Sequence, residues 1–294
     1  MEPSFFNHIE SELRKRFGTD FRLLNQEAVG GGCISRGARL TTSQGDFFIK
    51  WNSSAANDLF LREAEGLTEM GKAVSNELVI PKVILASEAG QWPGFIILEF
   101  LTTGHLHDQS EKLGLGLAVL HGYHNRQFGF HHDNYCGSTP QKNDWHANWI
   151  GFFINNRLLF LLDMLTESHR YDVPERKVFD RLIEKLPGLL LPSSLPSLIH
   201  GDLWSGNYLY TERGPALIDP AAYFADREME LSMMSLFGGF SPSTWSAYQA
   251  VFPLESGWEE RVRIYQLYHL LNHYYLFGGS YGHQSLLLAR KIAG

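Results

Sequence analysis

Apolar positions near the start of the chain follow a helical period first and a strand pattern afterwards. In residues 4–16, Phe5, Ile9 and Leu13 recur four positions apart behind a possible N-cap serine, which predicts an amphipathic helix. From 21 to 51, short apolar runs alternate with turn-forming residues, which predicts a small antiparallel sheet. A glycine run separates the first two strands of that sheet.

The pattern then adds a helix and two strands before it becomes mostly helical. The helix is predicted over 58–72, and the strands lie near 79–86 and 95–100. Beyond residue 101, apolar residues recur at helical spacing in five segments, which are 111–124, 148–168, 174–190, 229–240 and 261–279. One strand-loop-strand segment, 198–220, lies among them. We therefore predict two lobes, residues 1–100 with the sheet and residues 101–294 with most of the helices.

Composition and charge narrow the class of ligand. The 294 residues carry a formal net charge of −7, and a nucleic-acid partner is excluded because binding it requires a basic surface. A cationic or neutral substrate fits the acidic balance better. Cys33 and Cys136 lie far apart, the N-terminus lacks the pattern of a signal peptide, and the apolar run 158–162 is far shorter than the ~20 residues that span a bilayer. We expect a cytoplasmic protein that does not bind a membrane.

Three features of the N-terminal lobe suit phosphate binding. Gly30, Gly31 and Gly32 could let backbone N–H groups approach phosphate oxygens, although a glycine run is more often a plain turn. Lys50 ends an apolar strand and Glu63 follows thirteen residues later in a helix, as expected for a phosphate-holding lysine oriented by a carboxylate. Either charge alone would be an ordinary surface residue. Glu99, near the end of the last strand, is assigned with them to the nucleotide site.

The most specific signal is the segment HGDLWSGN at 200–207. It places Asp202 and Asn207 five positions apart in a loop between two apolar strands, and Asp219 follows after a hairpin. This is the arrangement in which one aspartate faces the acceptor hydroxyl while an asparagine and a second aspartate hold Mg²⁺ beside ATP. The alternative for Asp202 is a loop aspartate that caps its own backbone. His200 is expected to orient the loop by a hydrogen bond. The order of elements and motifs predicts an α+β, bilobal fold of the protein-kinase type.

Over nearly the whole chain, the sequence closely resembles the fructosamine kinase (ketosamine 3-kinase) family, a branch of the aminoglycoside-phosphotransferase-like kinases. The matching stretches are GGGCIS at 30–35, FFIK at 47–50, FGF at 128–130, QKNDWHANWIGFF at 141–153, HGDLWSGN at 200–207, IDPAAYFADREMEL at 218–231, LFGGF at 236–240 and YQLYHLLNHYYLFGG at 265–279. Three features distinguish this family from general antibiotic kinases: the tryptophan in HGDLWSGN, the LFGGF stretch and the LNH stretch. The metal motif reads Asp-Pro-Ala where a protein kinase has Asp-Phe-Gly, so a regulated activation segment is not expected.

The resemblance implies ATP-dependent phosphorylation of the third-carbon hydroxyl of a ketosamine, an amine that carries a fructose or ribulose unit. The product is unstable and releases the amine, which repairs glycated proteins or metabolites. By matching position, Asp202 would be the catalytic base, Asn207 and Asp219 the Mg²⁺ ligands, and Lys50 with Glu63 the phosphate-holding pair. Trp204 and His273 would belong to the sugar site. The acceptor could be free or protein-linked, and the chain a monomer or a homodimer.

Other interpretations of the sequence remain open. The chain could be a nucleotide-binding scaffold without catalysis, although the complete set of charged residues favours an enzyme. It could also be a kinase of the same fold that acts on an aminoglycoside or choline-like hydroxyl, against which Trp204 and LFGGF argue. Close histidine pairs such as His105 and His107 lack the recurring third and fourth ligands of a zinc site.

Two further predictions concern single residues. Trp145 and Trp149, four apart, would lie on one helix face, where packing is the default role and a place in the acceptor cleft the minority alternative. Cys33 directly follows the glycine run, where positive potential would stabilise a thiolate and make it sensitive to oxidants. A small buried thiol that fills a gap is an equal alternative for Cys33.

Overall fold

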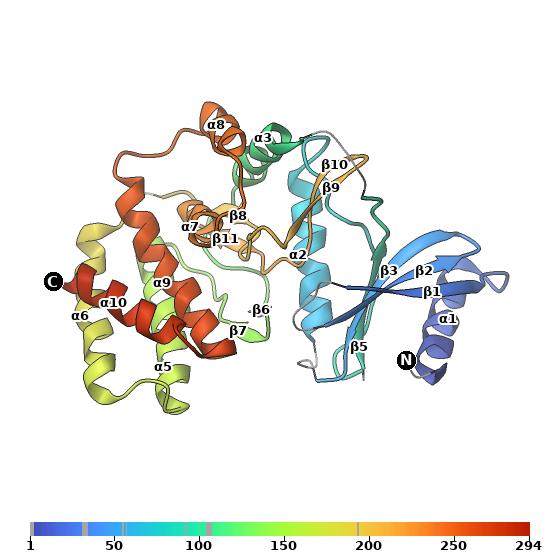
Figure 1. The fold of residues 1–294 in the computed structure, drawn as a ribbon, viewed down its shortest axis with the longest axis horizontal. Helices are drawn as coiled ribbons and strands as arrows, with labels where there is room; N and C mark the ends of the chain where they lie inside the picture. The colour runs from blue at the N-terminus through green and yellow to red at the C-terminus, as the bar shows by residue number, and fades with distance from the viewer. Residues whose placement is uncertain are drawn as a thin grey trace.

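The computed structural model describes residues 3–30, 35–54, 56, 58–91, 93–103, 108–192 and 194–294. A twisted sheet near the N-terminus and a helical part near the C-terminus lie side by side, and the two termini lie at opposite ends of the molecule (Figure 1). Gly31, Gly32, Cys33, His105 and His107 lie outside the described residues, so the predictions made for them stay untested.

The sheet is antiparallel throughout and has the strand order β1-β2-β3-β5-β4. Its strands are β1 (Leu23–Val29), β2 (Arg36–Thr42), β3 (Gly45–Asn52), β4 (Val83–Ala86) and β5 (Gly94–Glu99). Side chains alternate between the two faces of a strand, so β3 sends Phe47, Ile49 and Trp51 to one face and Lys50 to the other. This alternation determines which residues of β3 can reach a ligand.

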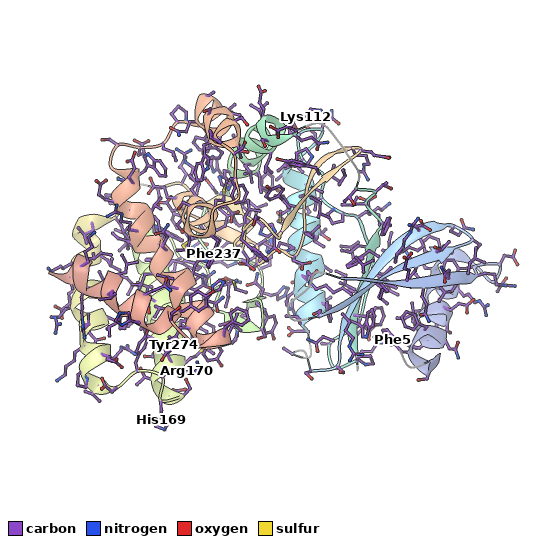
Figure 2. The ribbon with its side chains drawn as sticks, in the orientation of Figure 1. Phe5, Lys112, His169, Arg170, Phe237 and Tyr274 are labelled. Atoms are coloured by element: carbon purple, nitrogen blue, oxygen red, sulfur yellow. The ribbon has the colours of Figure 1, made fainter. Side chains whose placement is uncertain are left out.

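A helix covers each face of the sheet. α1 (Pro3–Phe17) buries Phe6, Ile9 and Leu13 against the first face, beside Phe5, which is labelled in Figure 2. The ring of Phe5 contacts that of Trp51 at a centroid distance of 5.7 Å. The helical spacing of these positions is the reason that one stripe of α1 is apolar. α2 (Leu59–Ala73) lies against the other face through Leu59, Phe60, Ala64 and Leu67, which pack on Ile96 and Leu98 of β5.

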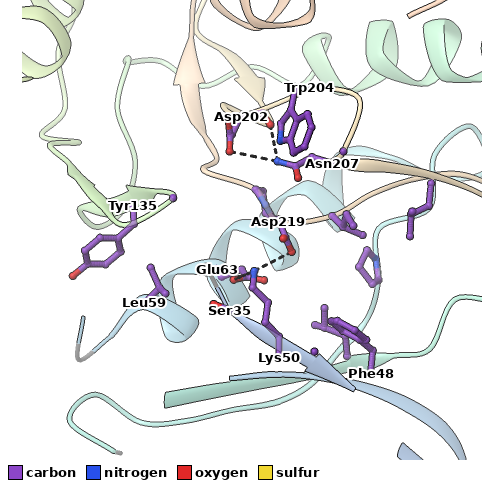
Figure 3. A pocket seen from close by; sticks show the side chains of 18 of the residues that line it. Ser35, Phe48, Lys50, Leu59, Glu63, Tyr135, Asp202, Trp204, Asn207 and Asp219 are labelled. Carbon is purple, nitrogen blue, oxygen red and sulfur yellow. Dashed lines mark hydrogen bonds and ion pairs between the residues drawn. The ribbon is translucent and has the colours of Figure 1, made fainter. Parts of the chain in front are cut away.

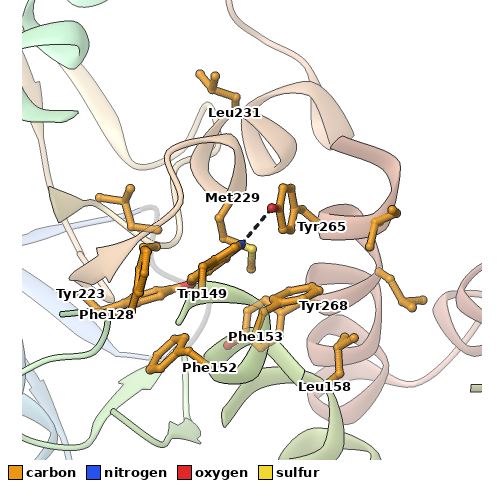
Figure 4. Close-up of a cluster of buried hydrophobic side chains, with 14 of the residues drawn as sticks. Phe128, Trp149, Phe152, Phe153, Leu158, Tyr223, Met229, Leu231, Tyr265 and Tyr268 are labelled. Atoms are coloured by element: carbon orange, nitrogen blue, oxygen red, sulfur yellow. Dashed lines mark hydrogen bonds between the residues drawn. The ribbon is translucent and has the colours of Figure 1, made fainter. Parts of the chain in front are cut away.

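The helical part surrounds a large aromatic core. Its helices are α3 (Ser110–His121), α4 (Trp149–Phe152), a π-helix (Phe153–Leu159), α5 (Phe160–Glu167), α6 (Val173–Leu189), α7 (Glu228–Phe237), α8 (Pro242–Val251), α9 (Trp258–Phe277) and α10 (Tyr281–Ala293). At the centre, the indole N–H of Trp149 donates to the hydroxyl of Tyr265 over 2.8 Å, so these two buried polar groups are paired (Figure 4). This core fixes α4 against α9.

Three short antiparallel strand pairs lie between the sheet and these helices. They pair β6 (Asn134–Cys136) with β7 (Thr139–Gln141), β8 (Ser197–Ile199) with β11 (Tyr223–Ala225), and β9 (Tyr208–Thr211) with β10 (Gly214–Leu217). The β9–β10 hairpin is nested in sequence between β8 and β11. Because both pairs are antiparallel, the loop 200–207 and the segment 218–222 connect the same two strand pairs and lie together. The nesting brings Asp202 near Asp219.

The prediction that Trp145 and Trp149 share a helix face is wrong. Asn148 has extended backbone angles, and its side chain accepts a hydrogen bond from Gly151 N over 2.9 Å, so the helix begins at Trp149. His146, which directly follows Trp145, instead forms an antiparallel bridge with Phe128. Trp149 is buried in the core, as its default role required. No helix in the described part of the chain is long and apolar enough to span a membrane.

Candidate active site

A cleft of about 750 Å³ lies between the sheet with α2 and the helical part. Sequence analysis predicted eleven site residues, and two of these, Gly31 and Gly32, lie outside the described residues. The other nine all line this one cleft; they are Gly30, Lys50, Glu63, Glu99, Asp202, Trp204, Asn207, Asp219 and His273. Residues from both halves of the sequence therefore converge as the spacing predicted. The chemical role of each remains to be tested.

Lys50 is the charge centre of the cleft. Its ammonium nitrogen lies 2.9 Å from Glu63 Oε2 and 3.0 Å from Asp219 Oδ1 (Figure 3). Burial disfavours the charge, but the carboxylates of Glu63 and Asp219 outweigh it and raise the pKa of Lys50 above its usual value. Lys50 is thus a fixed cation, held by α2 on one side and by the segment after β10 on the other.

The loop 200–207 is closed by its own asparagine. The side-chain amide of Asn207 donates to the main-chain carbonyl of Asp202 over 2.8 Å, and Asn207 N donates to the carbonyl of Trp204 over 2.9 Å. Ile218 N donates to the Asn207 carbonyl over 3.0 Å, which ties this loop to the segment that carries Asp219. The amide oxygen of Asn207 consequently points toward Asp219 (Figure 3).

The surroundings of Asp202 disfavour the ionised form of its carboxyl group. Part of its carboxylate faces the cleft, yet burial together with the nearby carboxylates of Glu230 and Asp219 raises its pKa to about 8. The hydrogen bond from Asn207 and the charge of Lys50 oppose this rise. A carboxyl whose pKa lies near neutrality is suited to accept a proton, because it binds the proton strongly once ionised. The loop-cap alternative does not by itself account for this environment.

His200 and Glu230 form hydrogen bonds with the backbone on the buried side of the loop 200–207. The His200 ring lies 2.7 Å from the Ile218 carbonyl through Nε2, so Nε2 carries the hydrogen, and Nδ1 accepts from Asp202 N over 3.3 Å. Burial lowers the pKa of His200, which keeps the ring neutral. Glu230, at the start of α7, accepts hydrogen bonds from the backbone N–H groups of His200 and Gly201. His200 thus makes the loop-orienting hydrogen bonds that the sequence analysis expected of it.

Two backbone positions at the site are sterically unusual. Asp219 has a φ of 57°, in the left-handed region that aspartate tolerates better than most residues. Gly201 has a φ of 83°, and a Cβ atom there would lie 2.2 Å from the Ala221 carbonyl oxygen. The chain therefore requires glycine before Asp202, because only glycine allows the two segments to approach so closely.

The donor set fits a Mg²⁺ ion. Asp219 offers a carboxylate and Asn207 an amide oxygen on the same side of the cleft, next to Lys50. Magnesium favours such hard oxygen ligands and commonly takes only one or two from the protein, with phosphate and water completing its shell. No cluster of three or more His, Cys, Asp or Glu side chains suited to a metal occurs in the described ranges.

Glu99 and Gly30 line the cleft in different ways. Both carboxylate oxygens of Glu99 already have partners, one at 2.9 Å from Arg213 Nη1 and the other accepting from Lys82 N over 3.0 Å. Contact with a nucleotide would therefore come more readily from its backbone than from its carboxylate. At Gly30, no atom of the described residues lies within 4 Å of the position of a Cβ atom.

The segment 236–240 supports the loop 200–207 at the part of the cleft lined by Trp204 and His273. Tyr208 OH donates to the Gly239 carbonyl over 2.9 Å, and a Cβ on Gly239 would lie 2.5 Å from Ser205 Cβ. The Trp204 ring lies over Gly206, where a Cβ would approach its atoms to 2.3 Å. The glycines of both segments thus make room for Trp204 and Ser205. This contact gives the LFGGF stretch a structural reason to occur together with the tryptophan loop.

Some residues of the site were not foreseen from the sequence. Phe237, Phe277 and Tyr281 line the cleft beside His273, and Glu230, which is buried behind the cleft, supports the loop 200–207. Phe277 follows His273 by four positions in α9, a spacing that could have indicated a shared face. Tyr281 lies at the start of α10, a helix that the sequence analysis did not predict.

Comparisons with known proteins agree with this geometry. A family model described as fructosamine kinase matches residues 5–293. The chain is 36% identical over 293 residues to a probable ketoamine kinase of Synechocystis sp., which covers 98% of this chain and 97% of that protein. It is 35% identical over 291 residues to the ketosamine-3-kinase of Mus musculus, with 90% of this chain and 93% of that protein covered.

Solved structures give the same result for the fold. A putative fructosamine-3-kinase from Haemophilus somnus superposes with a TM-score of 0.85 at 27% identity, covering 97% of this chain and 96% of that one. An aminoglycoside phosphotransferase solved with AMP-PNP and hygromycin B superposes with a TM-score of 0.63 at 16% identity, covering 97% and 96%. The predicted α+β, protein-kinase-like fold is confirmed. Because the family model spans nearly the whole chain and the relatives match over most of their length, the protein belongs to the fructosamine kinase family.

Proposed function

We propose that the protein is an ATP-dependent kinase that phosphorylates the third-carbon hydroxyl of ketosamines, either fructosamines or ribulosamines. The observation that carries this proposal is the convergence of Lys50, Asp202, Asn207 and Asp219 in one cleft, in a chain whose relatives are named ketoamine and ketosamine kinases. The phosphorylated product would be unstable and would release the amine, so the activity would remove sugar from amines or proteins.

The contacts in the cleft support a distinct role for each residue. Lys50, oriented by Glu63, would bind the phosphates of ATP as a fixed cation. Asp219 and the amide oxygen of Asn207 would hold Mg²⁺, which when bound neutralises phosphate charge. Asp202 would accept the proton of the attacking hydroxyl, since its raised pKa and its position on the cleft wall suit a base. Trp204 and His273 would contact the sugar.

Two alternatives predict different results in a single assay. A non-catalytic scaffold would bind ATP without turnover, and a kinase for another hydroxyl would act on kanamycin or choline. ADP release should be measured with Mg-ATP and ribulose-lysine, fructose-lysine, kanamycin or choline, with Asp202→Asn as the inactive control. Turnover with a ketose-lysine alone, followed by release of free lysine, is expected. Turnover with kanamycin or choline alone, or with none of the four, would refute the proposal.

A further inference from the structure

Five aromatic side chains gather at the acceptor end of the cleft. The His273 ring lies between three of them, with centroid distances of 4.8 Å to Phe237, 5.1 Å to Tyr281 and 5.7 Å to Phe277. Trp204 lines the same cleft from the loop 200–207. These residues come from four separate elements, since Phe237 ends α7, His273 and Phe277 lie in the last turns of α9, and Tyr281 begins α10 (Figure 2 for Phe237). We refer to these five residues as the aromatic wall.

The aromatic wall is open to ligand. Phe277 is 56% exposed, Phe237 40% and Trp204 36%, although large apolar side chains are usually buried. Clustering of such residues around a cleft is typical of a binding surface. Packing alone does not require this exposure, because the core of the helical part is complete behind them.

Charges are divided unequally between the two sides of the cleft. Its cationic lining residues, Arg36, Lys50 and Arg62, all come from the sheet and α2, where phosphates would bind. Among the described lining residues beyond position 103, there is no lysine or arginine, whereas Asp202 and Asp219 supply two carboxylates. The acceptor side therefore presents π faces with no described lysine or arginine side chain among them, a lining that favours a cation over an anion.

His273 has a ring nitrogen that can accept a hydrogen bond from a ligand in this part of the cleft. Its Nδ1 lies 2.8 Å from the His269 carbonyl oxygen, and a carbonyl only accepts, so Nδ1 carries the hydrogen. Burial lowers the pKa of His273, which leaves the ring neutral at pH 7. The lone pair is then on Nε2, at the edge of the ring that faces away from the helix backbone. An N–H group of a ligand cation can donate to it.

From these observations we infer that the aromatic wall binds the protonated amine of the acceptor by cation–π contacts and a hydrogen bond to His273 Nε2. The inference rests on the proposed function. In a ketosamine the amine is attached to the first carbon, only two carbons from the hydroxyl that would face Asp202, and an alkyl amine of this kind is cationic at neutral pH. The wall would make this charge a condition of good turnover and would exclude sugars that lack it.

Three synthetic acceptors that share one ketose and differ in the amine provide the test. The N-cyclohexyl and N-benzyl derivatives are cationic at neutral pH, whereas the N-phenyl derivative is neutral because its nitrogen is conjugated with the ring. We expect the value of kcat/KM for both cationic acceptors to exceed that for the neutral one by about tenfold or more, as partly desolvated cation–π contacts would give. The N-benzyl acceptor controls for aromatic stacking.

Variants assign the preference to the wall. Phe237→Leu and Phe277→Leu keep an apolar side chain and remove the π face, so each should reduce the cyclohexyl-to-phenyl ratio of kcat/KM severalfold, while Phe277→Tyr should retain it. Phe17→Leu is the matched control, since Phe17 is 37% exposed and lies on α1 away from the cleft. That variant should keep the wild-type ratio.

The possible outcomes separate this inference from the proposed function. Equal kcat/KM for the three acceptors would mean that the wall contacts only the sugar, and it would refute amine recognition while leaving ketosamine phosphorylation intact. A cationic preference that survives in both leucine variants would also refute the assignment to the wall. Absence of turnover with all three acceptors would refute the proposed function, and the inference would fall with it.

Discussion

Asn207 donates its side-chain amide to the main-chain carbonyl of Asp202 over 2.8 Å, which closes the loop that presents the Asp202 carboxylate to the cleft. The contact uses the backbone of Asp202 and only weakly its side chain, whose Oδ2 lies 3.4 Å from the same nitrogen. The loop can therefore keep its shape when the carboxylate is changed. Replacement of that one group becomes a clean test of its chemical role.

Asp202→Asn should lose turnover and keep the fold. An amide cannot accept the hydroxyl proton, and the loss of a general base typically lowers kcat by about 10²- to 10⁴-fold. Burial and the carboxylates of Glu230 and Asp219 disfavour the ionised form of Asp202, so the neutral side chain should leave the melting temperature unchanged or raise it. ADP-release kinetics, Mg-ATP titration calorimetry and thermal unfolding check these expectations. Near-normal kcat would show that Asp202 is not the base.

Lys50 and Asp219 should respond differently to magnesium, although they form an ion pair of 3.0 Å. Asp219→Asn weakens one oxygen ligand, so half-maximal activity should require a higher Mg²⁺ concentration. Lys50→Ala removes a cation that does not ligate metal, so kcat should fall and the KM for ATP should rise with a smaller change in the Mg²⁺ requirement. Steady-state rates across a Mg²⁺ titration distinguish the two variants. Identical Mg²⁺ curves, or a wild type that EDTA does not inhibit, would contradict the metal role.

Local sequence rules predicted most of the N-terminal sheet and the loop 200–207. Strand alternation alone places Lys50 opposite Ile49 and Trp51, and therefore in the cleft, and the sequence places Asp202 and Asn207 in one loop between two apolar strands. These features depend on residues that are close together in the sequence, so the spacing of apolar and polar residues is enough to predict them. The helical spacing gave a wrong prediction for Trp145, because the side chain of Asn148 caps the helix, which therefore begins at Trp149.

Features that depend on distant contacts could not be predicted in the same way. The aromatic wall unites residues from the loop 200–207 and three helices, and its Tyr281 lies in α10, a helix that the sequence analysis did not predict. Glu230 looks like an ordinary helix residue until the fold places it under His200 and Gly201. The division of charge across the cleft is likewise a property of packing, since Lys50 and Asp202 are far apart in sequence.

Gly201→Ala should destabilise the protein more than an equivalent change at another left-handed glycine. The new Cβ would lie 2.2 Å from the Ala221 carbonyl oxygen, so a steric cost of about 1 to 3 kcal/mol adds to a backbone cost of similar size. Gly18→Ala is the matched control, because Gly18 has a φ of 97° with open space around its Cβ position. Urea unfolding measures both variants. Equal losses in the free energy of unfolding would disprove the steric argument.

Glu230→Gln should shift the pH dependence of catalysis without touching the substrate. In the wild type, kcat/KM should fall as pH decreases through the pKa of Asp202, which burial, Glu230 and Asp219 raise to about 8, because the protonated carboxyl cannot act as a base. Glutamine removes one of the two like charges. The pKa of Asp202 should then fall, and the acidic limb of the profile should move to lower pH. Profiles of both proteins at saturating Mg-ATP measure the shift.

The same variant makes a separate prediction for the pH dependence of stability. Burial opposes the charge of Glu230, but His121, His200 and the loop amides outweigh it and hold the pKa of Glu230 below its usual value. A depressed carboxyl pKa stabilises the fold above the unfolded-state pKa, and this contribution is lost as pH falls through the folded-state value. Glu230→Gln should therefore cost about 1.5 to 3 kcal/mol at neutral pH, the range for hydrogen bonds to a charged group, and the difference from wild type should shrink in acid. If the stability loss is the same at every pH and the acidic limb of the kcat/KM profile does not move, Glu230 acts through its shape alone. If both the kcat/KM profile and the pH dependence of stability shift, the charge of Glu230 is the property that raises the pKa of Asp202.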